Sequence, residues 1–188
     1  MTTTHASMHA TTHAPKTDRP AGPLQWRRIV EWLRADGVIS EEEATRTIAR
    51  CSQAESSQHP LVRLDSVAMS RASDGKPLDI EMLTQYLAQR VGLDYLRIDP
   101  LKVDVGKVAD TMSASYAERH KVLPVQVTLK EVVVATAEPF ITDWVGEVER
   151  QARRPVRRVL TNPLDIHRYT VEFFALAKSV RAAQKSGG

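Results

Sequence analysis

Five arginines form the strongest cluster of like charge in this sequence. They fall between residues 150 and 158, at Arg150, Arg153, Arg154, Arg157 and Arg158. Guanidinium groups bind carboxylates and phosphates through paired N–H donors, so the cluster favours an anionic partner: an acidic protein surface, a nucleotide phosphate or a lipid headgroup. The other interpretation is a solvated strand edge and helix end, where arginine opposes aggregation. The residues alone leave both interpretations open.

A second pair of cations, Arg46 and Arg50, projects from a short predicted helix over residues 40–53. With the helix predicted over residues 24–36, it forms a unit that resembles a helix-turn-helix DNA-binding motif. The second helix begins with three glutamates, however, and phosphate contacts would favour the opposite charge there. A nucleic acid partner is therefore not the expected one, and DNA binding through this unit stays the third alternative. Arg46 and Arg50 join the five arginines as the candidate interaction surface.

No motif in the sequence predicts catalysis or a resident metal. It lacks the Gly-x4-Gly-Lys-Ser/Thr phosphate loop, the Gly-x-Ser-x-Gly nucleophile turn and any Cys/His metal set. Near the N-terminus, three histidines lie at four-residue spacing: His5, His9 and His13. On one face of a rigid helix they could bind a metal, but the flanking Thr and Pro residues oppose such a helix. We expect this chain to be non-catalytic and without a metal.

The composition is that of a soluble, intracellular globular protein. Hydrophobic residues make up 42% and charged residues 26%, which is ordinary for a folded domain. The single cysteine, Cys51, excludes an internal disulfide and fits a reducing compartment. No apolar run approaches the ~20 residues that a membrane span requires, and we expect no direct membrane insertion. The net charge of +3 is too mild to imply a nucleic acid partner.

The pattern of elements divides the chain into four parts. Residues 1–23 are rich in Thr, Ala, His and Pro and are predicted to be a disordered tail, because they cannot bury enough apolar surface. Residues 24–77 are predicted to be a small helical subdomain with a linker, in which Gly37 ends the first helix and a Ser40/Glu43 capping box begins the second. Residues 78–162 are predicted to be an α+β domain, and 163–188 a C-terminal helix and linker.

The α+β part predicts a small sheet of about three to four strands, packed by helices and followed by a long helix. Val132-Val-Val-Ala is apolar on both faces, which is typical of a strand in the middle of a covered sheet. Asn162-Pro163 is typical of a helix start. The expected elements are helix 78–91, strand 95–98, helices after Asp104 and over 116–120, strands 123–127 and 131–136, helix 141–152, strand 153–160 and a helix from 163.

Several short motifs follow one another along the second half of the chain. They are Leu-Ala-x-Arg-x-Gly-Leu from Leu87, Tyr-Leu-x-Ile-Asp-Pro-Leu from Tyr95, Ala-x-Arg-x-x-x-Leu-Pro-Val from Ala117, Val-Ala-Thr-Ala-Glu-Pro from Val134, and a basic strand with Asn-Pro-x-Asp-Ile from Arg157. This order resembles the MshEN-type N-terminal domain of type II secretion and type IV pilus assembly ATPases.

The resemblance implies a docking and regulatory role. In that family a C-terminal motor domain binds ATP and magnesium and works as a hexameric ring, and this chain carries no phosphate loop of its own. The N-terminal domains dock the motor onto the inner-membrane platform through a cytoplasmic protein. The resemblance therefore implies a cytoplasmic module, peripheral to the bacterial inner membrane, whose partners are the platform and the ATPase domain of the same protein.

A subset of the family binds cyclic di-GMP through paired Arg-Leu-Gly-x-x-Leu-Val-x-x-Gly-Leu-Ile motifs, each with a terminal Gln. Here the first motif would run from Arg28 to Gly37 and Ile39, and the second would begin at Arg63. The first motif departs from the pattern at three positions, with Val30 for glycine, Arg34 for an apolar residue and Cys51 for glutamine. Losing the glycine would place a side chain where the backbone should approach the nucleotide. Docking is therefore the expected function, and cyclic di-GMP binding through Arg28, Gly37 and Arg63 is the alternative.

Overall fold

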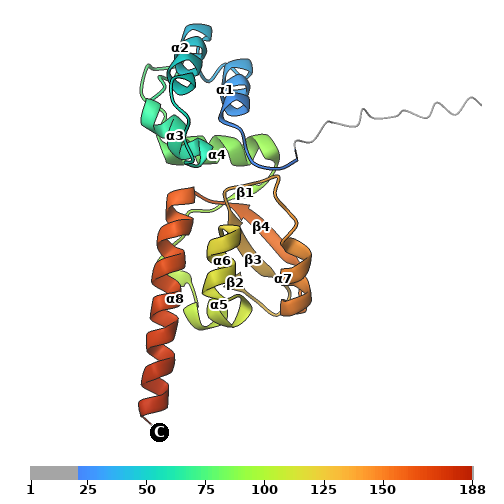
Figure 1. Cartoon of the computed structure of the whole chain (residues 1–188). Coiled ribbons are helices and arrows are strands. Elements are labelled where there is room, and N and C mark those ends of the chain that lie inside the picture. The colour runs from blue at the N-terminus through green and yellow to red at the C-terminus, as the bar shows by residue number, and fades with distance from the viewer. Residues whose placement is uncertain (1–20, 188) are drawn as a thin grey trace, which may run out of the picture.

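The computed structural model describes residues 21–187, so the predicted tail and its three histidines lie almost wholly outside the described residues. The described chain is an α+β fold, as predicted (Figure 1). Its helices are α1 Trp26–Ala35, α2 Glu41–Ser52, α3 Pro60–Val67, α4 Ile80–Val91, the 3-10 helix η1 Pro100–Lys102, α5 Val105–Thr111, α6 Ala114–His120, α7 Val145–Ala152 and α8 Pro163–Ser186. Its strands are β1 Asp94–Tyr95, β2 Val122–Val127, β3 Val132–Thr136 and β4 Val156–Leu160.

Helices α1–α4 pack around one hydrophobic core and form the helical half of the molecule (Figure 1). Gly37 follows α1 with a φ of 71°, the left-handed conformation predicted for it. The Ser40 hydroxyl accepts the Glu43 N–H at 3.1 Å and caps α2. The other half of the predicted capping box is wrong, because the Glu43 carboxylate pairs with Arg46.

Residues 52–77 combine a helix with the predicted linker. They contain α3, which begins at Pro60 and contributes Leu61 and Leu64 to the helical core. A turn lies between α3 and α4, where Gly75 has a φ of 70°. The domain boundary at residue 78 stays a prediction, and α4, which follows it, packs with α1–α3 through Leu83 and Leu87.

The four strands form one mixed sheet with the order β1-β4-β3-β2, and with α5–α8 they make the sheet half. Strand β3 pairs in parallel with β4 and antiparallel with β2. All five residues of β3 are buried, which confirms the predicted central strand. Because alternate residues of a strand face opposite sides, Val133 packs towards α5 and α8 and Val134 packs towards α7.

Three predicted elements have different bounds in the structure. Strand β1 ends at Tyr95 instead of Ile98, because its partner β4 ends at Leu160. Helix α7 begins at Val145, after a turn, and not at residue 141. Strand β4 begins at Val156 rather than at Arg153. The interpretation of β4 as a strand edge is also wrong, since β4 lies between β1 and β3.

Helix α8 begins as predicted, with the Asn162 side chain accepting the Leu164 N–H at 2.9 Å and Pro163 in the first turn. Tyr169 and Phe173 stack with their ring centroids 5.2 Å apart and cover one face of the sheet. The end of α8 runs past the sheet (Figure 1). Within residues 21–187, no helix combines the length and the apolar character that a bilayer crossing requires.

Candidate functional site

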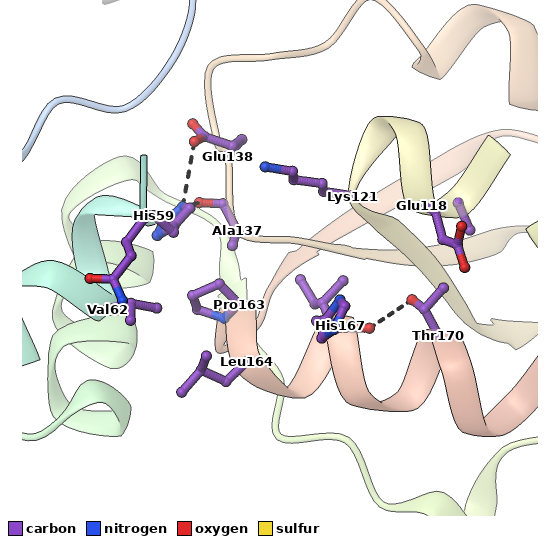
Figure 2. Close-up of a pocket in the computed structure, with 13 residues that line it drawn as sticks. His59, Val62, Glu118, Lys121, Ala137, Glu138, Pro163, Leu164, His167 and Thr170 are labelled. Atoms are coloured by element: carbon purple, nitrogen blue, oxygen red, sulfur yellow. Dashed lines mark hydrogen bonds and ion pairs between the residues drawn. The ribbon is translucent and has the colours of Figure 1, made fainter. Parts of the chain in front are cut away.

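The helical and sheet halves meet at a polar joint made by Leu24, His59, Ala137 and Glu138. Figure 2 shows the last three of these residues. The Leu24 N–H donates to Glu138 Oε2 at 2.8 Å, which ties the segment before α1 to the end of β3. His59 Nε2 lies 2.9 Å from the Ala137 carbonyl oxygen and ties the start of α3 to the same loop. The joint therefore connects segments that are 78 to 114 residues apart in sequence.

His59 is held as a neutral ring. The Leu61 N–H can only donate, so Nδ1 must accept it at 3.1 Å, and Nε2 carries the proton that it donates to the Ala137 carbonyl. Burial lowers the pKa of His59 to about 4. Burial also raises the pKa of Glu138, whose Oε1 lies 3.5 Å from His59 Nε2. With both ring nitrogens engaged, His59 acts as a connector and has no free nitrogen for proton transfer.

Two cavities flank the joint and share His59, Lys121 and Glu138 in their walls. The first is about 460 Å³ and lies between α3, α6 and the start of α8, with Val62 and Leu164 in its mainly apolar lining (Figure 2). The second, about 440 Å³, is more polar and lies beside the start of α1; its lining includes Trp26, Arg27, Ser56, Ser57 and Arg63.

Trp26 and two guanidinium groups form the most chemically specific wall of the second cavity. The guanidinium carbons of Arg27 and Arg63 lie 4.6 and 5.1 Å from the centroid of the Trp26 ring. Arg63 also donates to the carbonyls of Cys51 and Ala54, so it holds the C-terminal end of α2. An aromatic ring with two cations at a polar cavity could stack a base and pair with a phosphate.

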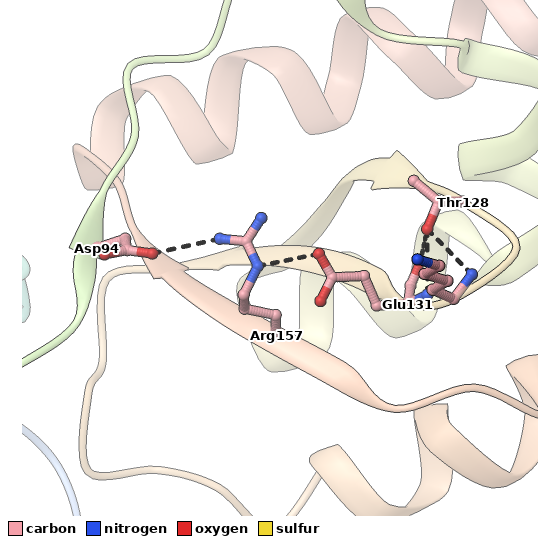
Figure 3. A network of polar contacts seen from close by, with 5 residues as sticks. Asp94, Thr128, Glu131 and Arg157 are labelled. Carbon is pink, nitrogen blue, oxygen red and sulfur yellow. Dashed lines mark hydrogen bonds and ion pairs between the residues drawn. The ribbon is translucent and has the colours of Figure 1, made fainter.

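The five predicted arginines at 150–158 do not share one face. Arg157 and Arg158 are neighbours in β4 and therefore point to opposite sides of the sheet. Arg157 lies between two carboxylates, with Nε 3.0 Å from Glu131 and Nη1 3.4 Å from Asp94 (Figure 3). Arg158 donates to the Pro139 carbonyl at 2.7 Å, and burial lowers its pKa.

The other predicted cations are spread over several elements. Arg150 donates back to Gly146 within α7, Arg153 ends α7 with a φ of 53°, and Arg154 follows it. On α2, far from these in sequence, Arg46 pairs with Glu43 and Arg50 donates to the Val67 carbonyl at 3.5 Å. These cations therefore lie on at least two surfaces of the molecule and do not form the single interaction surface that was predicted. That they bind a partner stays a prediction.

Residues 91–180 match the family model of the MshEN domain. The chain carries an MshEN domain. The family resemblance predicted from the sequence is therefore confirmed. Over 167 residues the chain is 33% identical to the type IV pilus assembly ATPase TfpB of Acinetobacter baylyi. That alignment covers 86% of this chain, which spans only 28% of the length of TfpB.

Two solved structures are similar to this MshEN protein. The structure of MshE with cyclic di-GMP has a TM-score of 0.58 at 15% identity, and the match covers 78% of this chain and 98% of that one. The N-terminal domain of XpsE has a TM-score of 0.48 at 17% identity, with 76% and 91% covered. At 15% identity the likeness to MshE is one of fold.

The polar joint lies across the border of the matched MshEN range. Leu24 and His59 precede residue 91, whereas Ala137 and Glu138 fall inside the range. Sequence reasoning missed this joint altogether. The available local signal was His59-Pro60, a capping side chain before a proline at the first helical position.

The residues predicted to hold a cyclic dinucleotide all precede the matched MshEN range. Arg63 lines the second cavity, whereas half-buried Arg28 and exposed Gly37 are absent from the walls of both cavities beside the joint. Val30 is fully buried in the helical core, so its side chain does not project onto the surface. That Val30 replaces a glycine which the nucleotide would approach stays a prediction.

Proposed function

We propose that this chain is a non-catalytic docking and regulatory module of a type IV pilus assembly or type II secretion ATPase. In this proposal a C-terminal motor domain binds ATP and magnesium in a hexameric ring. The module works in the cytoplasm and binds the inner-membrane platform or the cytoplasmic protein attached to it. The likeness to TfpB over most of the chain supports this assignment.

The observation that carries the docking role is the surface of α8. Six large apolar side chains are exposed in the described residues, and four of them lie on this helix: Leu164, Val171, Leu176 and Val180. Scattered exposed apolar residues are ordinary, but two pairs on one helix favour surfaces that a protein partner covers. At about 100° per residue, the first two share one side of α8 and the last two share roughly the opposite side. Helix α8 also projects beyond the sheet, where a partner can reach it (Figure 1).

Co-purification of the full-length protein with the platform proteins of its own assembly system tests this proposal. We expect capture by the wild type and loss of capture by Val171→Glu with Leu176→Glu, because both side chains are half exposed on α8. Leu129→Glu is the matched control, since Leu129 is 92% exposed in a turn far from α8 in sequence. A wild-type protein that captures no platform protein would overturn the docking role.

The second candidate is a cyclic di-GMP receptor, and the wall of Trp26, Arg27 and Arg63 favours it. The shared fold with MshE, solved with that nucleotide, adds support. Calorimetric titration of the wild type with cyclic di-GMP should give saturable heat. Loss of heat in Trp26→Ala would place the nucleotide at the cavity wall, and loss in Arg28→Ala would place it at the predicted sequence motif. Arg150→Ala is the control and should bind like the wild type. Absence of heat from folded wild-type protein would end this candidate.

A further inference from the structure

A groove lies between the α5–α6 turn and the outer part of α8. Its volume is about 590 Å³. Apolar side chains form its floor, with Met112 from the end of α5 and Phe174 and Ala177 from α8. Lys178, Arg181 and Lys185 form its rim and are all exposed.

The rim carries net positive charge. After Glu172, the sequence contains no acidic residue up to Gly188, so α8 ends as a basic helix. The acidic group that meets the rim is Asp110, whose Oδ1 lies 2.5 Å from Arg181 Nη2. Lys178 and Lys185 make no ion pair in the described residues. Two cations therefore remain available on the edge of an apolar floor.

We propose that this groove binds an amphipathic helix of a partner protein, with its apolar face on the floor and acidic side chains against Lys178 and Lys185. The proposal rests on the docking role above and adds a second contact surface on α8, because the four exposed apolar side chains of that helix do not line the groove. A cleft between two helices with an apolar floor is the shape that accepts a third helix. Charge complementarity then requires an acidic helix, and sets its orientation along α8.

The same chemistry fits other occupants less well. An anionic lipid surface would meet Asp110, which is 74% exposed on the rim, and a flat headgroup layer does not fill a concave floor. A second copy docking α8 against α8 would bring an equally basic rim to the groove, where like charges repel. The partner is therefore a protein helix of opposite charge.

Fluorescence anisotropy with a labelled synthetic peptide tests the proposal on the whole chain. The probe is an amphipathic helix of about 18 residues, or five turns, with leucines on one face and glutamates beside them. We expect saturable binding that weakens as salt rises. The triple variant K178E/R181E/K185E should weaken binding at least tenfold and gain affinity for the same peptide with lysines in place of the glutamates.

The controls separate charge at the groove from charge elsewhere. The variant K76E/K102E/K130E makes the same change in net charge at exposed lysines away from the groove and should bind like the wild type. Equal binding of the glutamate and lysine peptides, preference for phosphatidylglycerol vesicles, or concentration-dependent dimerisation in the ultracentrifuge would each overturn the proposal. If K178E/R181E/K185E still captures the platform proteins, this inference falls while the docking role stands.

Discussion

His59 shows how a single buried side chain can make the stability of this molecule depend on pH. Its folded pKa of about 4 lies below the ordinary 6.5, so between these values the unfolded chain binds more protons. Stability should therefore fall as the pH drops from about 6.5 to about 4, by up to about 3 kcal/mol from this group. Urea unfolding across this range, in wild type and His59→Gln, measures the difference.

Glu138 works in the opposite direction at the same joint. Burial raises its pKa, so its contribution favours the folded state at low pH and is lost as the pH rises through the folded pKa. Comparing the wild type with His59→Gln isolates the contribution of the histidine to the pH dependence of stability. In Glu138→Gln the opposing contribution is absent, so stability should fall more steeply as the pH drops. Parallel pH curves for wild type and His59→Gln would contradict the assignment of a buried neutral His59.

Residue-level prediction succeeded where the signal is local. Ser40 and Asn162 cap their helices as expected, because a cap depends only on residues two or three positions away. It failed for His59 and Glu138, whose partners lie 78 and 114 residues away. It also failed to separate Arg157 from Arg158, since the charge pattern says nothing of which carboxylates and carbonyls the sheet brings beside them.

At the scale of elements, strand β4 offers a direct comparison of two neighbouring arginines. Arg158 is half-buried and donates to a carbonyl, so Arg158→Met should lower the free energy of unfolding by about 1–2 kcal/mol. Arg157 is exposed on the other face and pairs with exposed Asp94 and half-buried Glu131, so Arg157→Met should cost less than about 1 kcal/mol. Chemical denaturation of both variants checks the order, and a larger loss for Arg157→Met would contradict it.

The ends of helices supply a second prediction through two glycines. Gly92 ends α4 with a φ of 74°, so Gly92→Ala should destabilise the protein by about 1 kcal/mol. Gly146 lies in the first turn of α7 without a positive φ or a crowded neighbour, so Gly146→Ala should stabilise by about 0.5 kcal/mol. Thermal unfolding of both variants checks that one substitution lowers the stability of the protein and the other raises it. Destabilisation by both variants would show that the backbone conformation at residue 92 is not the cause.

Element type was more predictable than element position. Val132–Ala135 identified the central strand because burial on both faces leaves a continuous apolar run. The place of β4 inside the sheet could not be predicted, because the two arginines in its sequence resemble those of an edge strand. The length of β1 depends on where β4 turns into α8, which is a property of the sheet and not of residues 95–98.

At the scale of the whole molecule, the two halves are joined by polar contacts and by shared core. The Glu81 carboxylate of α4 accepts the Asn162 amide at 2.8 Å and the Tyr95 hydroxyl, and Leu160 of β4 packs in the helical core. Trp32 and Phe140 meet edge to face across the same boundary, with ring centroids 6.3 Å apart. These contacts predict that the wild type unfolds in one cooperative transition.

Removing the polar connectors should separate the halves, since each has its own buried core. We expect the double variant Glu81→Ala with His59→Ala to leave β3 protected in hydrogen exchange while amides of α1–α4 exchange earlier, because the smaller helical core loses two of its attachments. Glu118→Ala removes an exposed carboxylate on α6 and is the single-charge control. In this variant the amides of α1–α4 and of β3 should still exchange at the same rate. If α1–α4 and β3 still exchange together in the double variant, the apolar contacts of Leu160 and Trp32 alone hold the halves as one cooperative unit.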